Sequence, residues 1–147
     1  MSIATAITTP AVVCLPTADI TQVARMMHEH DIGCVVIVDL DQRPVGIVTD
    51  RDLVTRALAS GRARTTAVSD VMSRDPATIT LDHDTVDAAR QMADHECRRL
   101  PVINPTGQVV GVITFDDLIL RAGHTLDELN RIVTVERAGR GFAKHTS

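Results

Sequence analysis

The fold is decided by two stretches of seven residues, Gly-Ile-Val-Thr-Asp-Arg-Asp at 46–52 and Gly-Val-Ile-Thr-Phe-Asp-Asp at 111–117. In each stretch a glycine and β-branched residues lead to a threonine, and an aspartate follows three positions later. β-branched residues favour a strand, and Thr-x-x-Asp is typical of a helix N-terminus, where the two residues cap each other's backbone. Each stretch therefore predicts a buried strand followed by a helix.

The two stretches belong to a longer internal repeat. The offset of 65 residues that relates Gly46 to Gly111 also relates an earlier block of identical residues: Asp19 to Asp84, Ala24 to Ala89, Arg25 to Arg90, Met27 to Met92 and His30 to His95. No insertion interrupts this register. A single register held over so many residues indicates a duplicated structural unit.

Each copy is expected to fold as strand, helix, strand, strand, helix. Apolar residues at helical spacing predict the first helix of each copy, and short β-branched runs predict the strands. The expected strands are 12–15, 34–38 and 45–48 in the first copy, and 78–81, 100–103 and 109–113 in the second. The last helix of each copy begins at Thr49 or Thr114, and Gly61 and Gly123 stand where these helices should end.

The predicted fold class is α/β (α+β), with two tandem βαββα units packed in pseudo-twofold symmetry. A unit of about 60 residues buries little surface alone, so two copies should share a core. We expect the units at residues 4–62 and 69–124, joined by a linker at 63–68. Residues 125–147 are expected to form a C-terminal helical segment and a disordered basic tail.

Composition excludes several classes of function. The chain has 147 residues, a net charge of −4, two Phe and no Tyr or Trp, which disfavours nucleic-acid binding by stacking or by charge. No apolar run approaches the roughly 20 residues needed to span a bilayer, and the N-terminus lacks the charge of a secretory signal. Cys14, Cys34 and Cys97 lack metal or disulfide spacing, so we expect reduced thiols in a cytoplasmic protein.

The two Gly-apolar-x-Thr-x-x-Asp stretches resemble the signature of CBS (cystathionine-β-synthase) domains. His95-x-x-Arg98-Arg99-Leu100-Pro101-Val102 is similar to the strand that precedes the signature in that family, and Ser-Asp-Val-Met-Ser at 69–73 to the segment that leads into each unit. The resemblance covers about residues 4–124. It implies a stand-alone CBS pair (a Bateman module), which commonly forms a homodimer and binds AMP, ADP, ATP or S-adenosylmethionine between its units.

The resemblance assigns a phosphate to the threonines and a ribose to the aspartates of the signature. It therefore implies that Thr49 and Asp52 form one nucleotide site and that Thr114 and Asp117 form another. A helix N-terminus attracts phosphate on physical grounds as well. Helix capping alone also explains the same residues, and the two roles are compatible.

Charged residues make the two candidate sites unequal. Arg51 lies beside Asp52, whereas the equivalent position in the second copy is an acid, Asp116. Arg98 and Arg99 instead precede the buried strand of the second copy. Because arginine is a good bidentate partner of phosphate, we expect Arg51 to serve the site of Thr49 and Asp52, and Arg98 or Arg99 the other. The alternative for these arginines is a solvated edge or a salt bridge.

The family comparison also implies an apolar slot for adenine, with Val12, Val35, Ala77 and Leu100 as candidate walls, although each residue taken alone is more often part of a core than a contact to a base. His30 and His95 end equivalent helices, where histidine is more often a cap than a metal ligand, so no metal site is predicted. No catalytic constellation stands out, and we expect no enzyme activity.

The leading hypothesis is a regulatory module that binds an adenine nucleotide and acts through an unidentified effector protein or through its own oligomer. The main alternative is a structural or interaction protein, a CBS dimer whose pockets hold no physiological ligand. An enzyme that acts on a nucleotide is a third and remote alternative.

Overall fold

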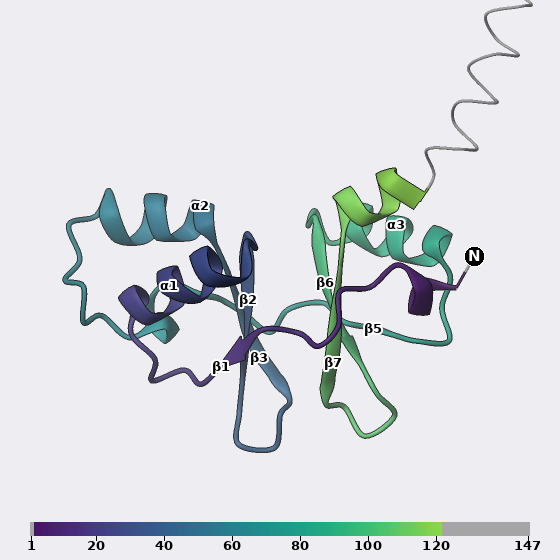
Figure 1. Ribbon diagram of the computed structural model, residues 1–147, viewed down its shortest axis with the longest axis horizontal. Helices are drawn as coiled ribbons and strands as arrows, with labels where there is room; N and C mark the ends of the chain where they lie inside the picture. The colour runs from purple at the N-terminus through teal and green to yellow at the C-terminus, as the bar shows by residue number, and fades with distance from the viewer. Residues whose placement is uncertain (1, 122–147) are drawn as a thin grey trace, which may run out of the picture.

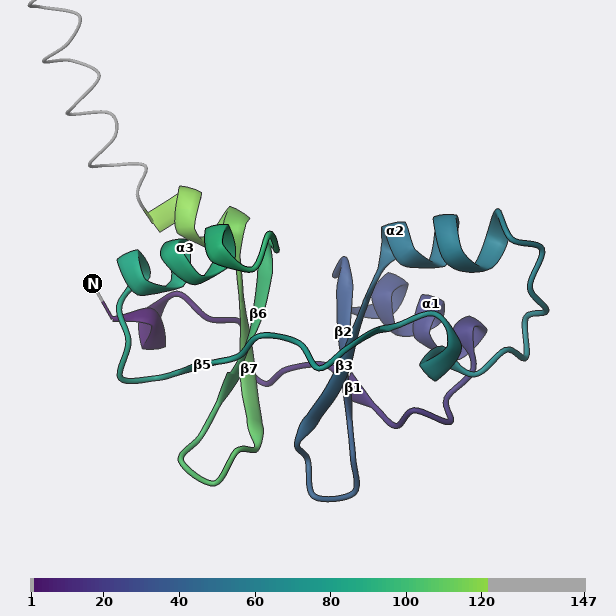
Figure 2. The same ribbon diagram turned by 180° about the vertical axis from the view of Figure 1, so that it is seen from behind.

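The computed structural model of the chain describes residues 2–121, which form two small sheets with helices on their outer sides (Figures 1 and 2). One sheet has the strand order β1-β2-β3-β4, and the other has the order β5-β6-β7. The two sheets face each other across the middle of the molecule, and the helices cover the faces that point away. The chain is thus an α+β protein with two βαββα units related by pseudo-twofold symmetry.

The first unit contains β1 (Val13–Cys14), α1 (Ile20–His30), β2 (Cys34–Val38), β3 (Pro44–Thr49) and α2 (Asp50–Asp52), which continues as a π-helical segment, Leu53–Leu58. β1 runs parallel to β2, and β2 runs antiparallel to β3. α1 begins with a capping box between Asp19 and Gln22, and it ends at Asp31, whose φ of 51° breaks the helix.

The second unit repeats this order. It contains β5 (Ile79–Thr80), α3 (Thr85–Asp94), β6 (Arg99–Ile103), β7 (Val109–Thr114) and a helical stretch at 115–121. A capping box of Asp84 and Asp87 begins α3. The register is also repeated, because Arg99 pairs with Thr114 as Cys34 pairs with Thr49.

Three clusters of buried aliphatic side chains hold the units together. One lies under α1 in the first unit, around Val23, Val35 and Val48. A second lies under α3 in the second unit, around Ile79, Leu100 and Ile113. A third contains Cys34, Val36, Val38 and Val112 and joins the two sheets. The inter-unit cluster confirms that the two copies share buried surface, as their small size predicts.

The segments that lead into each copy are exchanged between the units. The N-terminal 3-10 turn η1 (Ile3–Thr5) places Ile3 and Ala6 in the core of the second unit, and Thr8 pairs with Val112 of β7. In return, the 3-10 turn η3 (Val68–Asp70) and β4 (Ser73–Arg74) pack on the first unit, where β4 pairs with β3.

This exchange explains the glycine of each signature. A Cβ atom on Gly111 would lie 2.9 Å from the carbonyl oxygen of Thr8, too close for two unbonded atoms. A Cβ on Gly46 would collide with the side chain of Met72, which follows η3. Each glycine therefore makes room for the leading segment that arrives from the other half of the sequence.

The sequence predicted the order of the elements, and the structure shortens the first strand of each copy to two residues. The sequence did not predict β4 or the exchange of segments. The domain bounds at 4–62 and 69–124 stay a prediction, while Gly123 and the predicted C-terminal segment 125–147 lie outside the described residues. None of the helices within residues 2–121 has the length and apolar character needed to cross a membrane.

Candidate functional site

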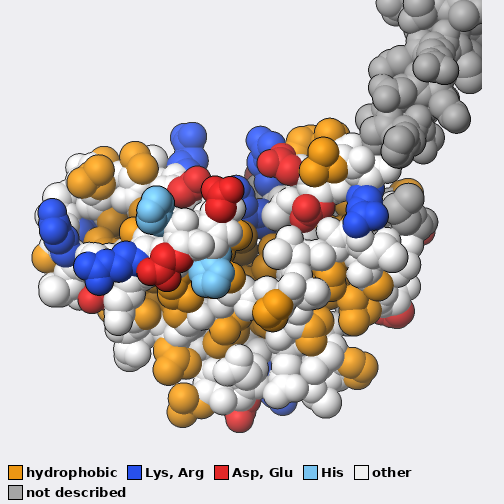
Figure 3. Space-filling view, viewed as in Figure 1, with side chains coloured by type: hydrophobic (Ala, Val, Ile, Leu, Met, Phe, Trp, Pro, Cys, Tyr) orange, Lys and Arg blue, Asp and Glu red, His pale blue; other side chains and the backbone are white. Residues whose placement is uncertain are grey.

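Two clefts open between the units. The first cleft has a volume of about 440 Å³, and the second cleft has a volume of about 430 Å³. Figure 3 shows a notch between the two halves of the molecule, with side chains of both charges around it. Each cleft is walled by the signature threonine and aspartate of one unit and by the loop that enters the buried strand of the other unit.

The first cleft takes its signature residues from the second unit. Thr114 and Asp117 line it from one side, and residues 31–34 and Arg51 of the first unit line it from the other. Ala11 and Val12 add apolar surface, and Val12 therefore lies where an apolar wall was predicted.

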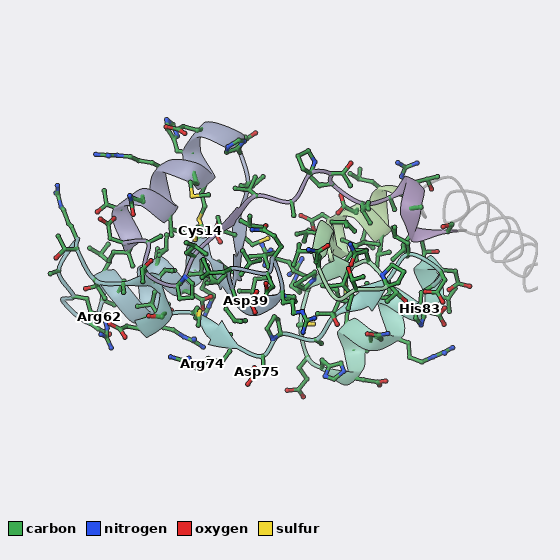
Figure 4. The ribbon with its side chains drawn as sticks, turned by 90° about the horizontal axis from the view of Figure 1, so that it is seen from below. Cys14, Asp39, Arg62, Arg74, Asp75 and His83 are labelled. Atoms are coloured by element: carbon green, nitrogen blue, oxygen red, sulfur yellow. The ribbon has the colours of Figure 1, made fainter. Side chains whose placement is uncertain are left out.

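The second cleft is the counterpart of the first. Thr49 and Asp52 of the first unit face residues 95–99 of the second unit. Ala77, another predicted wall, lines this cleft together with Asp75. Figure 4 labels Asp75, which lies on the segment that crosses from β4 to β5.

The signature residues cap their helices, as Thr-x-x-Asp predicts. The backbone N–H of Asp52 donates to Thr49 Oγ1 at 3.2 Å, and the N–H of Thr49 donates to Asp52 Oδ2 at 2.9 Å. The equivalent distances for Asp117 and Thr114 are 3.1 and 2.8 Å. This capping geometry holds both carboxylates and both hydroxyls at the cleft walls in fixed positions.

The two aspartates differ in their ionic partners. Asp52 Oδ1 lies 3.6 Å from Arg56 Nε, one helical turn later. The equivalent of Arg56 is Arg121, which instead donates to the backbone carbonyl of Thr5 in the exchanged N-terminal segment. The carboxylate of Asp52 is therefore partly neutralised by its own helix, and Arg121 is used to hold the exchanged segment.

Arg51 lies in the first cleft, beside Thr114 and Asp117. The prediction that Arg51 serves the site of Thr49 and Asp52 is therefore wrong. Successive residues of a helix point about 100° apart, so neighbours in the sequence can face different clefts. Asp52 turns back to the start of its own helix, whereas Arg51 faces the second unit's signature.

Arg98 and Arg99 line both clefts. Arg98 Nη2 lies 3.5 Å from Asp116 Oδ1, and its guanidinium carbon lies 4.7 Å from the centre of the Phe115 ring. The alternative of a salt bridge to Asp116 is thus realised for Arg98. This pair is exposed, so it contributes little stability and leaves the guanidinium available to another anion.

Val35 and Leu100 line neither cleft. Both side chains are fully buried, Val35 in the core of the first unit and Leu100 in that of the second. For these two residues the structure supports the alternative, that they are core residues.

Sequence reasoning missed the loops that enter the buried strands. Residues 31–34 line the first cleft, and their equivalents at the offset of 65, residues 96–99, line the second. The repeat itself carried this signal, because both loops follow the matched helix ends His30 and His95. Only the packing of the units places each loop opposite the signature of the other copy.

The cysteine thiols are held in their neutral form. Burial raises the pKa of the Cys34 thiol in the first cleft, and the nearby Arg99 guanidinium partly opposes this rise. Burial also raises the pKa of Cys97 in the second cleft. Within residues 2–121, no group of three His, Cys, Asp or Glu side chains is arranged to hold a metal ion.

A family model described as the CBS domain matches residues 3–59 and 68–123. The chain belongs to the CBS domain family. This CBS pair is 35% identical over 105 residues to an uncharacterized protein, MK0525, of Methanopyrus kandleri. The match covers 71% of this chain and 54% of that protein, so this CBS pair spans about half the length of that relative.

Solved CBS pairs have the same fold. The CBS domain protein PAE2072 from Pyrobaculum aerophilum, complexed with AMP, has a TM-score of 0.73 and 28% identity, covering 80% of this chain and 89% of that one. The CBS domain pair of protein MJ0100, in complex with 5′-methylthioadenosine and S-adenosyl-L-methionine, has a TM-score of 0.77, covering 85% of this chain and 98% of that one. Its 24% identity shows the fold alone.

Proposed function

We propose that this CBS pair is a regulatory module that binds an adenine nucleotide of the AMP or ATP type between its two units. The observation that carries the proposal is the composition of the first cleft, where Thr114, Asp117 and three arginines meet from both units, with Asp31, Asp50 and Asp116 also in its wall. A relative of the same fold, PAE2072, is complexed with AMP.

Each wall of the first cleft suits one part of a nucleotide. The arginines, Arg51, Arg98 and Arg99, supply charge-assisted hydrogen bonds for phosphate. The hydroxyl of Thr114 donates to Asp117 Oδ2 at 2.8 Å, so it must turn away from that carboxylate to donate to a phosphate. The Asp117 carboxylate can accept hydrogen bonds from ribose hydroxyls. Val12 contributes apolar surface against which a base can pack.

The second cleft has an equivalent lining with fewer positively charged side chains. Thr49 and Asp52 stand where Thr114 and Asp117 stand in the first cleft, and Ala77 supplies apolar surface. The position of Arg51 is taken by Asp116 in the second copy, so no third arginine enters the second cleft from the helix start.

The output of the module passes through an effector protein or through a homodimer. Exposed apolar side chains, including Val54, Leu58, Ile119 and Leu120, lie on the last helices of the two units. A groove of about 810 Å³ runs between α3 and the helix at 115–121. Such apolar surface is typical of a protein interface and supports a homodimer. Cys14, Cys34 and Cys97 are free thiols, which supports the cytoplasmic location that we propose.

Thermal unfolding with AMP, ADP, ATP and S-adenosylmethionine tests the proposal. A ligand at 100 times its dissociation constant should stabilise the folded protein by about 2.7 kcal/mol. The informative variant is Asp117→Ala, which removes a helix cap and a cleft carboxylate together. Its control is Asp84→Ala, which removes the N-cap side chain from the capping box of α3 and lines neither cleft.

We expect Asp117→Ala to abolish the ligand-induced shift of the first cleft and Asp84→Ala to retain it. If no ligand raises the melting temperature of the wild-type protein, the alternative of a structural CBS dimer without a physiological ligand is favoured. Sedimentation equilibrium of the unliganded protein then tests whether the chain is a dimer.

A further inference from the structure

We propose that the two clefts are negatively coupled for phosphate-bearing ligands, because both depend on the guanidinium groups of Arg98 and Arg99. The first cleft then takes the nucleotide, and the second takes an uncharged adenosyl compound such as a nucleoside. This assignment rests on the proposed function, since it requires both clefts to accept an adenosyl group.

Of the arginines within residues 2–121, Arg98 and Arg99 alone line the second cleft, and both also line the first. Arg98 directly precedes β6 and Arg99 begins it, where Arg99 pairs with Thr114 of the first cleft. A guanidinium group drawn against a phosphate in one cleft has fewer of its five N–H donors left for the other cleft. An anion held by these arginines in one cleft therefore withdraws positive charge from the other.

The protein holds both arginines on the side of the first cleft. Arg98 contacts Asp116 and Phe115, which line the first cleft and not the second. Arg99 lies in the space left by Gly33, with its Nη2 atom 3.2 Å from where a Cβ would stand. The equivalent of Gly33 in the second copy is Arg98 itself, so the second cleft has no such space.

The charges that remain in the second cleft are acidic. Once the two guanidinium groups are engaged in the first cleft, the carboxylates of Asp52, Asp75 and Glu96 and the imidazole of His95 face the second cleft, and Asp52 keeps its ion pair with Arg56. Carboxylates repel a phosphate but accept hydrogen bonds from ribose hydroxyls. The second cleft thus favours a ligand without phosphate, and coupling between the clefts acts equally in both directions.

Calorimetric titration of the full chain with AMP, and separately with adenosine, tests this coupling. We expect AMP to bind in two steps with dissociation constants that differ by about tenfold, within the range typical of coupled sites. Adenosine carries no phosphate and should bind the second cleft without this penalty. Unequal but independent clefts could also give two steps, so a variant must separate the two explanations.

Blocking the first cleft distinguishes coupled clefts from clefts that are unequal but independent. In Asp117→Ala the first cleft loses its ribose carboxylate, and Arg98 and Arg99 become free to serve the second cleft. AMP should then bind the second cleft about fivefold more tightly than in the second step of the wild-type titration. Independent clefts predict an unchanged dissociation constant, and a change of less than twofold would overturn the coupling.

Gly33→Leu provides a second variant that does not touch a helix cap. A leucine side chain at this position fills the first cleft and displaces the Arg99 guanidinium, so it should also tighten AMP binding in the second cleft. Asp84→Ala, which lies outside both clefts, should leave both steps unchanged. Failure of both AMP and adenosine to bind the wild-type protein would overturn the proposed function itself, whereas binding with independent steps overturns only the coupling.

Discussion

Replacement of Gly111 by alanine tests whether the exchanged N-terminal segment stabilises the second unit. The new Cβ would lie 2.9 Å from the carbonyl oxygen of Thr8 and 3.0 Å from Ile7 Cδ1. The oxygen belongs to the backbone and cannot rotate away, so residues 7–9 must move by about half an ångström to restore ordinary contact distances. That movement strains a short backbone pairing.

The magnitude follows from what this pairing contains. Thr8 N–H donates to the Val112 carbonyl at 3.0 Å, and Val112 N–H donates to the Thr8 carbonyl at 3.2 Å. Each backbone bond contributes about 1 kcal/mol, and overpacking a close contact costs about 1–3 kcal/mol, so we expect a loss of about 2 kcal/mol. At roughly 4 °C per kcal/mol, the melting temperature should fall by about 8 °C.

Gly46→Ala is the matched control, because Gly46 is the same signature position in the first unit. The three atoms nearest its Cβ all belong to the side chain of Met72, and the closest of them, Sδ, lies well inside van der Waals contact. Met72 is buried, but its side chain is flexible and the contact involves no backbone atom, so the cost should be smaller. Urea unfolding measures both losses, and amide exchange at Val112 reports the pairing directly. The reasoning is refuted if Gly111→Ala costs less than about 0.5 kcal/mol, or no more than Gly46→Ala.

Three further predictions concern other parts of the chain. Ile3→Ala should lower the free energy of unfolding in urea by about 2–5 kcal/mol, because Ile3 is fully buried in the second unit. The control Val54→Ala changes an exposed side chain and should be nearly neutral. Equal losses in the two variants would contradict the exchange of segments. Asp19→Ala should lower the free energy of unfolding by about 1 kcal/mol, because it removes the N-cap of α1. Asp19→Asn keeps a capping oxygen and should retain most of that stability; an equal loss in both variants would show that the cap is not the cause. Burial raises the pKa of Cys14 from 9.0 to about 11, so its contribution to stability is present below pH 9 and is lost as pH rises toward 11. The chain has no tyrosine and a single lysine, but burial also raises the pKa of Cys34 and Cys97. Cys14→Ala should therefore flatten part of the fall in urea midpoint between pH 9 and 11; an unchanged slope would contradict the assignment.

Most of the fold was predictable because its signals are local and occur twice. β2, for example, has the predicted bounds of 34–38, since five consecutive apolar residues between polar turns can hardly form anything else in a small α+β protein. The capping of α2 by Thr49 and Asp52 was predictable for the same reason, because both partners lie within four residues.

The composition of each cleft was harder to predict, because it depends on contacts between distant parts of the chain. Arg51 and Asp52 are neighbours in the sequence but line different clefts. β4 was missed because Ser73 and Arg74 carry no strand pattern of their own and become a strand only by pairing with β3. Pairing across the units is set by packing that a single sequence does not display.

The exchange of leading segments has a consequence for synthesis of the chain. Val112, to which Thr8 pairs, is made more than a hundred residues after Thr8. The first unit likewise lacks β4 until the chain has passed Arg74. Neither half can reach its final form during translation of its own sequence. The pair completes its folding only after Val112 has been made, and separation of the halves would leave each with an open sheet edge that the other half covers.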